Sequence, residues 1–276
     1  MNKGKKTQNI REVNNVWNET KYLAFNVYKK TSITIFIIAI FSLIILPFFI
    51  ISLSLIPIYV AFLYIKATKQ FMRHFAKING LLYSETAVLE SVSGRLFQVG
   101  HSQSITNVIS GAHLQYPIRI FNYKYTVGSG KHSQTYNFTI LEMSFEKTVF
   151  PHIILQSKKM WGYAGYDILG NIQDSKIHLV GPFEDVFQLY SENGYEIEVL
   201  QIFTPEILSH LQENAKNFSI EFSANHMYIF DDKTLGTMKE LNTLFDVSKK
   251  ILSSNGEIID RLHDDFSALH PYYQER

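Results

Sequence analysis

The stretch that decides the organisation of this chain is residues 33–65, ITIFIIAIFSLIILPFFIISLSLIPIYVAFLYI, which contains no Asp, Glu, Lys, Arg or His. Lys29 and Lys30 precede this run, and Lys66 and Lys69 follow it. Such a run is typical of a membrane-embedded segment, since one span needs about 20 predominantly apolar residues. The sequence therefore predicts a membrane protein with a soluble domain after the run.

The run is too long for one upright helix. It would reach about 50 Å, whereas the hydrocarbon core of a bilayer is about 30 Å thick. Pro47 and Pro57 also lie within it, and proline disrupts a helix interior. Two arrangements fit: a hairpin of two short spans (roughly Ile33–Leu46 and Phe49–Ile65) that turns near Pro47, or a single tilted span that continues as a helix out of the membrane.

The flanking charges favour the hairpin. Residues 1–32 carry seven basic and two acidic side chains, and residues 66–77 carry four basic and no acidic ones. Basic residues mark the cytoplasmic ends of membrane segments, and only a hairpin places both ends there. We expect a multi-pass protein of the cell (inner) membrane, with both termini and the soluble domain in the cytoplasm. The long polar segment before the run argues against a cleaved signal peptide.

The leader, residues 1–32, has two interpretations. Ile10, Val13 and Trp17 recur at helical spacing, which fits an interfacial helix on the cytoplasmic leaflet. The alternative is a polar tail that leads to the first span. The residues expected at the membrane interface are Trp17, Lys29, Lys30, Lys66 and Lys69.

The charge of the remaining chain disfavours nucleic acid as a partner. Residues 1–77 carry a net charge of +9, and because the whole chain carries +1, residues 78–276 carry −8. Phosphate binding relies on Lys and Arg, which are in the minority in that part. The chain also has no cysteine, which excludes disulfides, thiolate metal sites and a cysteine nucleophile.

The soluble part predicts an α+β fold in two halves. Residues 66–82 read as a helix that leaves the membrane, residues 83–160 as an antiparallel β-meander, and residues 161–276 as a mixed α+β half, with helices packed on one side of the sheet. Whether the halves share a core stays open. The elements expected are strands 95–99, 105–114, 118–127, 134–145, 176–180 and 196–203, helices 182–190, 205–215 and 235–252, and a hairpin over 218–230.

Gly128-Ser129-Gly130-Lys131 superficially resembles a phosphate loop. That motif needs GxxxxGK[ST] between a strand and a helix, whereas both flanks here read as strands. We therefore interpret the segment as a hairpin turn. No catalytic residue and no cofactor is predicted, because the chain shows no GxSxG motif and no assignable Ser/His/Asp set.

Histidines of the meander are the candidate metal ligands. His101-Ser102-Gln103 and His132-Ser133-Gln134 repeat one tripeptide, and His113 lies between them. Stacked hairpins could bring His101, His113 and His132 together. The alternative is that they are surface or strand-end histidines, because no i, i+4 His pair and no HExxH motif is present.

Aromatic residues concentrate in the predicted strands. Tyr123, Tyr125 and Tyr136 could form a platform that binds a peptide or a lipid. The alternative is that these rings follow the preference of aromatic residues for half-buried strands, where they pair across the sheet.

The order of the parts resembles a group of uncharacterised bacterial membrane proteins with two spans and a cytoplasmic domain of unknown function. The residues that carry the resemblance are the run Ile33–Ile65 and the segments Gly94–Ser102 and Phe121–Gly128. The resemblance implies the architecture and no functional residue.

Together these patterns favour a binding module over an enzyme. We expect a membrane-anchored cytoplasmic module that binds or scaffolds a protein or peptide, with the lipid bilayer and a membrane or membrane-associated protein as partners. Self-association into a homo-oligomer is a further possibility. The alternative function is a metal-dependent, hydrolase-like enzyme that uses His101, His113 and His132.

Overall fold

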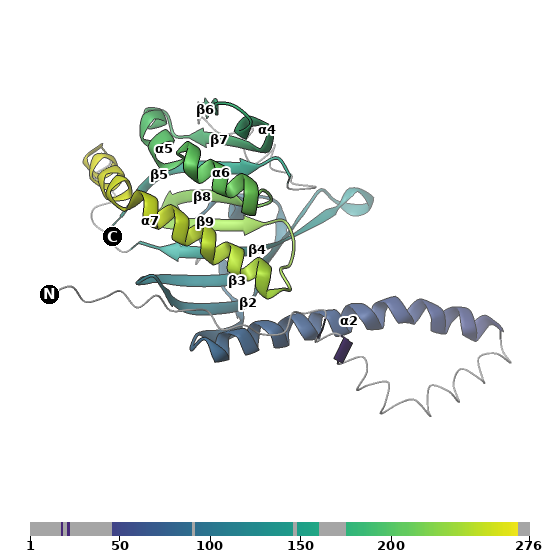
Figure 1. Ribbon diagram of the computed structural model, residues 1–276. Coiled ribbons are helices and arrows are strands. Elements are labelled where there is room, and N and C mark those ends of the chain that lie inside the picture. The colour runs from purple at the N-terminus through teal and green to yellow at the C-terminus, as the bar shows by residue number, and fades with distance from the viewer. Residues whose placement is uncertain are drawn as a thin grey trace.

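Nine antiparallel strands form one sheet in the computed structural model, which describes residues 18, 21–22, 46–89, 92–145, 148–159 and 175–269 (Figure 1). The strand order is β1-β2-β3-β4-β9-β8-β5-β7-β6. The strands are β1 (Leu82–Ala87), β2 (His101–His113), β3 (Tyr116–Val127), β4 (Gln134–Ser144), β5 (Phe150–Ser157), β6 (Ser175–Ile177), β7 (Phe187–Ser191), β8 (Ser219–Ala224) and β9 (His226–Asp231).

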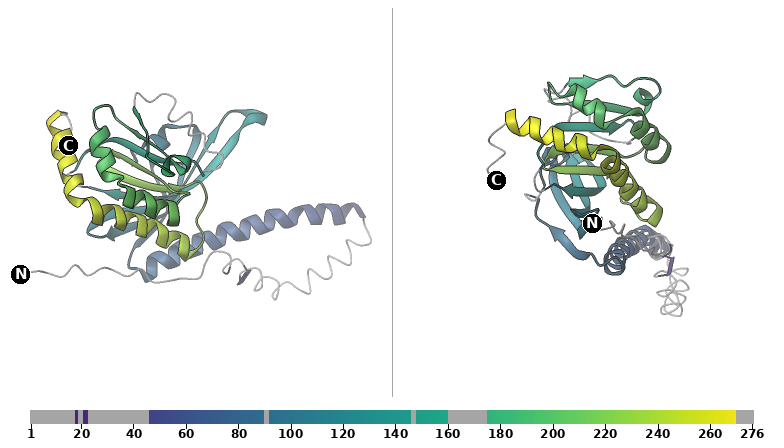
Figure 2. Two further views of the ribbon diagram at one scale, coloured as in Figure 1. Left: turned by 45° about the horizontal axis from the view of Figure 1, so that its top comes forward. Right: turned by 60° about the vertical axis from the view of Figure 1, so that its left-hand side comes forward.

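The longer helices lie on one face of this sheet. Figures 1 and 2 show α5, α6 and α7 across that face, and α2 along the edge formed by β1 and β2. The described α-helices are α2 (Leu46–Ile78), α4 (Phe183–Val186), α5 (Glu196–Ile202), α6 (Pro205–Asn214) and α7 (Met238–Leu269), and the 3₁₀ turns are η2 (Arg95–Gln98) and η3 (Gly130–His132). The predicted α+β class with an antiparallel sheet is therefore confirmed.

Alternation along the strands builds two cores, one on each face. On β3, Ile118 and Ile120 point to the helix-covered face and pack with residues of α2, α5, α6 and α7. Phe121, Tyr123 and Tyr125 point to the opposite face, which we call the second face. There η2 and its neighbours cover the rings, because Leu96 and Phe97 are buried against them.

The two halves suggested by the sequence meet within the sheet. Strand β4 of the first half pairs with β9 of the second, and β8 pairs with β5. The helix-covered core is likewise continuous across both halves. The regions 83–160 and 161–276 therefore share one sheet, and both contribute to the core on each of its faces.

Three local predictions are wrong. Residues 95–98 form the 3₁₀ turn η2, whereas a strand was expected over 95–99. The expected helix 182–190 is the single turn α4, after which β7 pairs with β5. The expected strand 196–203 is the helix α5, in which Val199 and Ile202 are buried while Ile197 and Leu200 are exposed. Pairing with a distant strand, or packing on the core, decided each of these segments.

Other local predictions are confirmed. Helix α6 begins after Thr204, whose hydroxyl accepts a hydrogen bond from the backbone N–H of Ile207, and Pro205 occupies the first turn. The predicted hairpin over 218–230 is β8–β9. The predicted turn after residue 127 joins β3 to β4.

Helix α2 runs without interruption across Ile65 and Lys66, and Pro57 lies inside it. It ends in a Schellman motif, in which the N–H of Gly80 (φ +68°) bonds the carbonyl of Lys77 and the N–H of Leu81 bonds that of Ala76. Of the first predicted span, Ile33–Leu46, residues 33–45 lie outside the described residues. Within the part of the chain that the structure describes, no helix combines the length and the apolar character needed to cross a membrane.

Candidate functional site

The three candidate metal histidines do not lie together. His101 and His113 occupy opposite ends of β2, and the eleven residues between them allow a separation of up to about 40 Å. The His101 ring contacts the carbonyl of Gly128 through Nε2 (2.8 Å), and His132 lies in η3. Among the described residues, no group of three or more His, Cys, Asp or Glu side chains could hold a metal ion.

His113 lies in a packing contact with a helix. Its ring packs edge-on against Phe245 of α7, with 4.8 Å between the ring centroids. Burial lowers the pKa of this imidazole, and the charge of Lys249 lowers it further. The side chain is therefore a neutral packing partner of α7.

The tyrosines of the predicted platform belong mostly to the interior. Tyr123 and Tyr125 are 1% and 0% exposed, and Tyr136 is half-buried. The Tyr125 ring stacks on Phe138 at 5.6 Å and on Tyr136 at 5.3 Å. Burial raises the pKa of both buried hydroxyls. Tyr123 and Tyr125 belong to the core of the second face and Tyr136 packs against it, so the three rings do not form an exposed platform.

Helix α2 has two chemically different halves. Its first 20 residues, Leu46–Ile65, which we call the apolar half, contain no charged residue. Figure 1 shows that this half extends beyond the sheet. Its large side chains that are exposed are Leu55, Ile56, Ile58, Tyr59, Val60, Phe62, Tyr64 and Ile65.

The second half of α2, Lys66–Ile78, packs on the sheet. Ala67, Phe71 and Phe75 are buried in the helix-covered core. On its polar side, Lys69 and Arg73 both form ion pairs with Glu85 of β1 (2.6 and 3.1 Å). Of the predicted interface residues, Lys66 and Lys69 therefore lie where the apolar half ends, and Trp17, Lys29 and Lys30 lie outside the described residues.

A cavity of about 300 Å³, which we call the junction cavity, lies where the apolar half of α2 meets the sheet. Its lining comes from α2, from β2, β3 and β4, and from the loop before α7. The lining residues are Tyr64, Ile65, Thr68, Ser104, Thr106, Asn107, Asn122, Tyr123, Lys124, Asn137 and Thr234. Most of its lining residues carry an amide or a hydroxyl group, although apolar atoms contribute the larger part of the lining surface.

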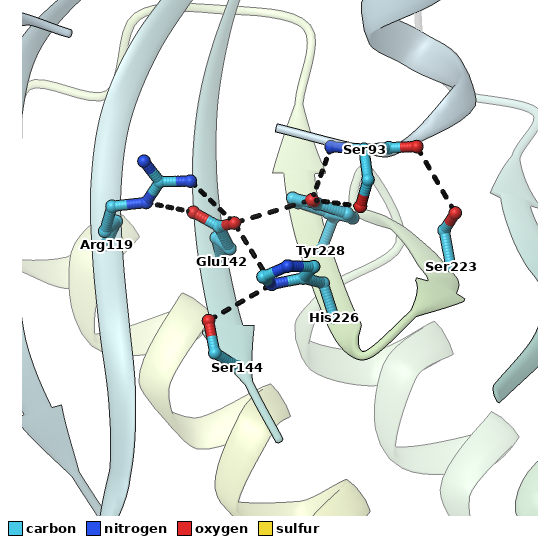
Figure 3. Close-up of polar contacts among 7 residues, drawn as sticks. All are labelled: Ser93, Arg119, Glu142, Ser144, Ser223, His226 and Tyr228. Carbon is cyan, nitrogen blue, oxygen red and sulfur yellow. Dashed lines mark hydrogen bonds and ion pairs between the residues drawn. The ribbon is translucent and has the colours of Figure 1, made fainter. Parts of the chain in front are cut away.

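A buried polar network on the second face centres on Glu142 (Figure 3). The register aligns Arg119, Glu142, Tyr228 and Glu221 in one row across β3, β4, β9 and β8. The Glu142 carboxylate is 1% exposed and accepts hydrogen bonds from Nε and Nη2 of Arg119, the latter at 2.8 Å. It also contacts Nδ1 of His226 at 3.2 Å and accepts a long bond from the Tyr228 hydroxyl at 3.4 Å.

The geometry of this network does not form a Ser-His-Glu relay. Ser144 Oγ and Glu142 Oε1 both contact the same ring nitrogen of His226, Nδ1, at 3.1 and 3.2 Å. A relay needs the nucleophile and the carboxylate on opposite nitrogens of the imidazole. Burial lowers the pKa of His226, although the charge of Glu142 opposes this shift. The network is therefore a neutralised buried ion pair with a neutral histidine beside it.

Glu221 is the second buried carboxylate of the row. Its Oε1 accepts a hydrogen bond from the backbone N–H of Arg95 (2.6 Å) and lies 3.1 Å from Nε2 of His152. The backbone N–H of Ser93 similarly bonds the Tyr228 hydroxyl. These bonds attach residues 93–95 to β8 and β9. The two carboxylates are about 10 Å apart, two strand spacings, so they do not form a shared site.

Sequence reasoning missed both carboxylates. The signal that could have identified them is a single acid between apolar strand residues, as in Leu141-Glu142-Met143 and Ile220-Glu221-Phe222. A charge in such a setting is buried only when it is paired.

An open groove of about 660 Å³ lies between α6 and α7. Its lining combines Met238 and Val247 with nine polar side chains, among which three lysines outnumber one aspartate. The polar members are His210, Asn214, Lys239, Asn242, Thr243, Asp246, Lys249, Lys250 and Ser253. The groove is the larger of the two hollows described and lies on the face opposite the Glu142 network.

Comparison with known proteins finds a structural similarity. No family model matches the chain, and no curated protein sequence matches it. The crystal structure of the mycobacterial trehalose monomycolate transport factor A, TtfA, is similar with a TM-score of 0.47 and 12% identity, over 67% of this chain and 94% of that one.

Proposed function

We propose that this chain is a membrane-attached module that binds a protein or peptide partner. The uncharged run 33–65 inserts into the cell membrane as a hairpin, and the folded domain lies on the cytoplasmic side. The observation that carries the proposal is the apolar half of α2, whose exposed Ile, Leu and Phe side chains continue directly into a helix segment buried in the core.

Physical chemistry supports insertion of this segment in lipid. Full burial of a Leu, Ile or Phe side chain contributes about 1.5–3 kcal/mol relative to exposure in water. A contiguous exposed apolar surface of this kind marks a contact with a membrane or a partner. Lys66, Lys69, Arg73 and Lys77 follow within three turns, and such a basic cluster favours the cytoplasmic, anionic surface of the bilayer.

Substitution of Ile58 by Lys tests the attachment. Ile58 is 66% exposed, so the folded domain should tolerate the change, whereas lysine within the lipid-inserted helix is unfavourable. We expect the full-length variant to partition onto phospholipid vesicles at least about tenfold more weakly in a flotation assay. The control is Ile197→Lys on α5, where the isoleucine is 70% exposed and partitioning should not change. Equal partitioning of both variants and the wild type contradicts membrane attachment.

The groove between α6 and α7 is the best-supported place for the partner. Its volume lies in the range of ligand-binding clefts, and its basic lining is unlike the acidic average of residues 78–276. Attachment to the membrane raises the effective concentration of any partner held at the same surface.

Site-specific crosslinking in cells tests this placement. A photoreactive residue at Asn242, in the groove, is expected to yield one dominant crosslinked partner or a second copy of the chain. The same residue at Ile197, an exposed position outside the groove, should not crosslink to it. The charge-reversed background Lys239→Glu/Lys249→Glu should weaken the Asn242 crosslink. Equal crosslinking from Asn242 and Ile197 contradicts the assignment of the groove.

A further inference from the structure

We propose that the junction cavity binds the headgroup of a membrane phospholipid that carries both free hydroxyls and a phosphate. This inference rests on the proposed function, because it takes the apolar half of α2 to be inserted in lipid. Three observations carry it: the position of the cavity, the chemistry of its lining, and the backbone that shapes it.

The cavity lies at the level where the bilayer surface would be. Its α2 residues are Tyr64, Ile65 and Thr68, and these span the point where the uncharged run ends and Lys66 begins. Tyrosine is enriched at this depth, where the ring meets the acyl chains and the hydroxyl meets water. Figures 1 and 2 show that the β3–β4 hairpin projects in the same direction as the apolar half of α2. A lipid beside α2 would therefore place its headgroup at the mouth of the cavity.

The lining matches a headgroup with hydroxyls and one negative charge. Asn107, Asn122 and Asn137 each offer amide donors and an acceptor, as polyol hydroxyls require. Lys124 is the one cationic residue of the described lining, which contains no carboxylate. One exposed ammonium suits one phosphate group. A strongly anionic ligand would call for several cations, and a choline headgroup offers no hydroxyl donor to the amides.

The sheet contributes polar lining residues at the place where the side chains on its helix-covered face change from apolar to polar. Beyond Ile120, β3 turns Asn122 and Lys124 toward that face. In register beside them lie Thr106 and Ser104 of β2, and Asn137 of β4. The polar rows therefore continue across three strands next to α2.

A bulge in β2 shapes the same wall. The register between β2 and β3 shifts after Thr106, and Asn107 adopts a left-handed conformation (φ +53°). The Asn107 side chain is held there by the Tyr83 hydroxyl, which donates to its Oδ1 at 2.9 Å. Bulges re-aim side chains next to binding sites.

The test is native mass spectrometry of the full-length chain released from nanodiscs of phosphatidylcholine with a minor share of phosphatidylglycerol. We expect one phosphatidylglycerol to remain bound in preference to phosphatidylcholine. The variant Asn122→Ala/Asn137→Ala should lower that occupancy roughly thirty-fold, as expected for the loss of two hydrogen bonds. Lys124→Gln should also lower the occupancy by phosphatidylglycerol. Because Lys124 is exposed, this variant should fold normally, and it tests the cavity even if the double variant misfolds.

The matched control removes two amides elsewhere. Asn214→Ala/Asn242→Ala alters the groove between α6 and α7 and should leave occupancy unchanged. Equal occupancy by phosphatidylcholine, or an equal loss in this control, overturns the inference. Binding of glycerol 3-phosphate from solution as tightly as of the lipid overturns the assignment to a lipid. Incorporation into nanodiscs, read separately by size exclusion, tests membrane attachment itself, so its failure is distinguishable from failure of the cavity.

Discussion

Replacement of Arg119 by alanine is expected to lower the free energy of unfolding by about 3–5 kcal/mol at pH 7. The arginine neutralises Glu142, whose side chain is 1% exposed. Its removal leaves a buried carboxylate whose remaining polar contacts, among the described residues, are with His226 and Tyr228. An unpaired buried charge is far more costly than the loss of one surface interaction. Chemical denaturation of the full-length chain, followed by circular dichroism, measures the change.

Two further variants identify the cause of this loss. The double variant Arg119→Met/Glu142→Leu removes both charges and keeps apolar volume, so it should be much closer to the wild type than Arg119→Ala is. Lys69→Ala breaks an ion pair whose side chains are 38% and 58% exposed, and it should destabilise the protein far less than Arg119→Ala does. A loss below about 1 kcal/mol for Arg119→Ala at pH 7 would show that water solvates the carboxylate.

The second large effect is the pH dependence that Asp231 confers. This residue ends β9 at 2% exposure, and burial raises the pKa of its carboxyl to about 7 despite the nearby charge of Lys233. The folded state therefore retains a proton that the unfolded state loses near pH 4. Because the folded state binds more protons over this interval, stability falls as the pH rises from about 4 to about 7.

Asp231→Asn should remove this decline. Relative to the wild type, the variant should gain on the order of 4 kcal/mol between pH 4 and pH 8, with most of the gain below pH 7. His113 and His226, whose pKa values burial lowers, act in the opposite direction below pH 6.5, but they are present in both proteins and cancel in the difference. Denaturation midpoints across this pH range provide the measurement.

The neighbouring residue contributes to this raised pKa. Burial is the largest cause, and both the hydrogen bond with the Asp232 side chain and the charge of Asp232 raise the pKa of Asp231 further. Asp232→Asn should therefore reduce the decline of stability with pH, whereas Asp231→Asn should abolish it. Parallel pH profiles for Asp231→Asn and the wild type would mean that Asp231 is ionised in the folded state.

The local sequence pattern was sufficient to predict an element wherever the residues that determine it are neighbours in the chain. The two-residue alternation of β3 and β4 predicted both strands and the turn between them. Thr204 and Pro205 predicted the start of α6. The local pattern gave a wrong prediction at Glu196–Ile202. Its alternation fits a strand, but packing of Val199 and Ile202 on the core selects a helix.

The candidate sites depended on distant parts of the chain. Tyr123 and Tyr125 alternate as exposed platform residues would, but Leu96 and Phe97 cover the second face on which they lie. The repeated tripeptides containing His101 and His132 were visible in sequence, yet His113 lies at the far end of β2. The Glu142 network joins three strands, and no short segment contains more than part of it.

The sequence by itself determined the α+β class, the antiparallel meander and the uncharged run 33–65, because these depend on hydrophobic periodicity and composition within short windows. Only the tertiary structure decided that both halves share one sheet, that the aromatic rings are interior, and that polar side chains gather beside the end of the apolar half of α2. The reason is physical. Strand pairing and burial bring together residues that are far apart in the chain, as Glu142 and Tyr228 are. The pattern within a short window of sequence does not show which distant residues become neighbours.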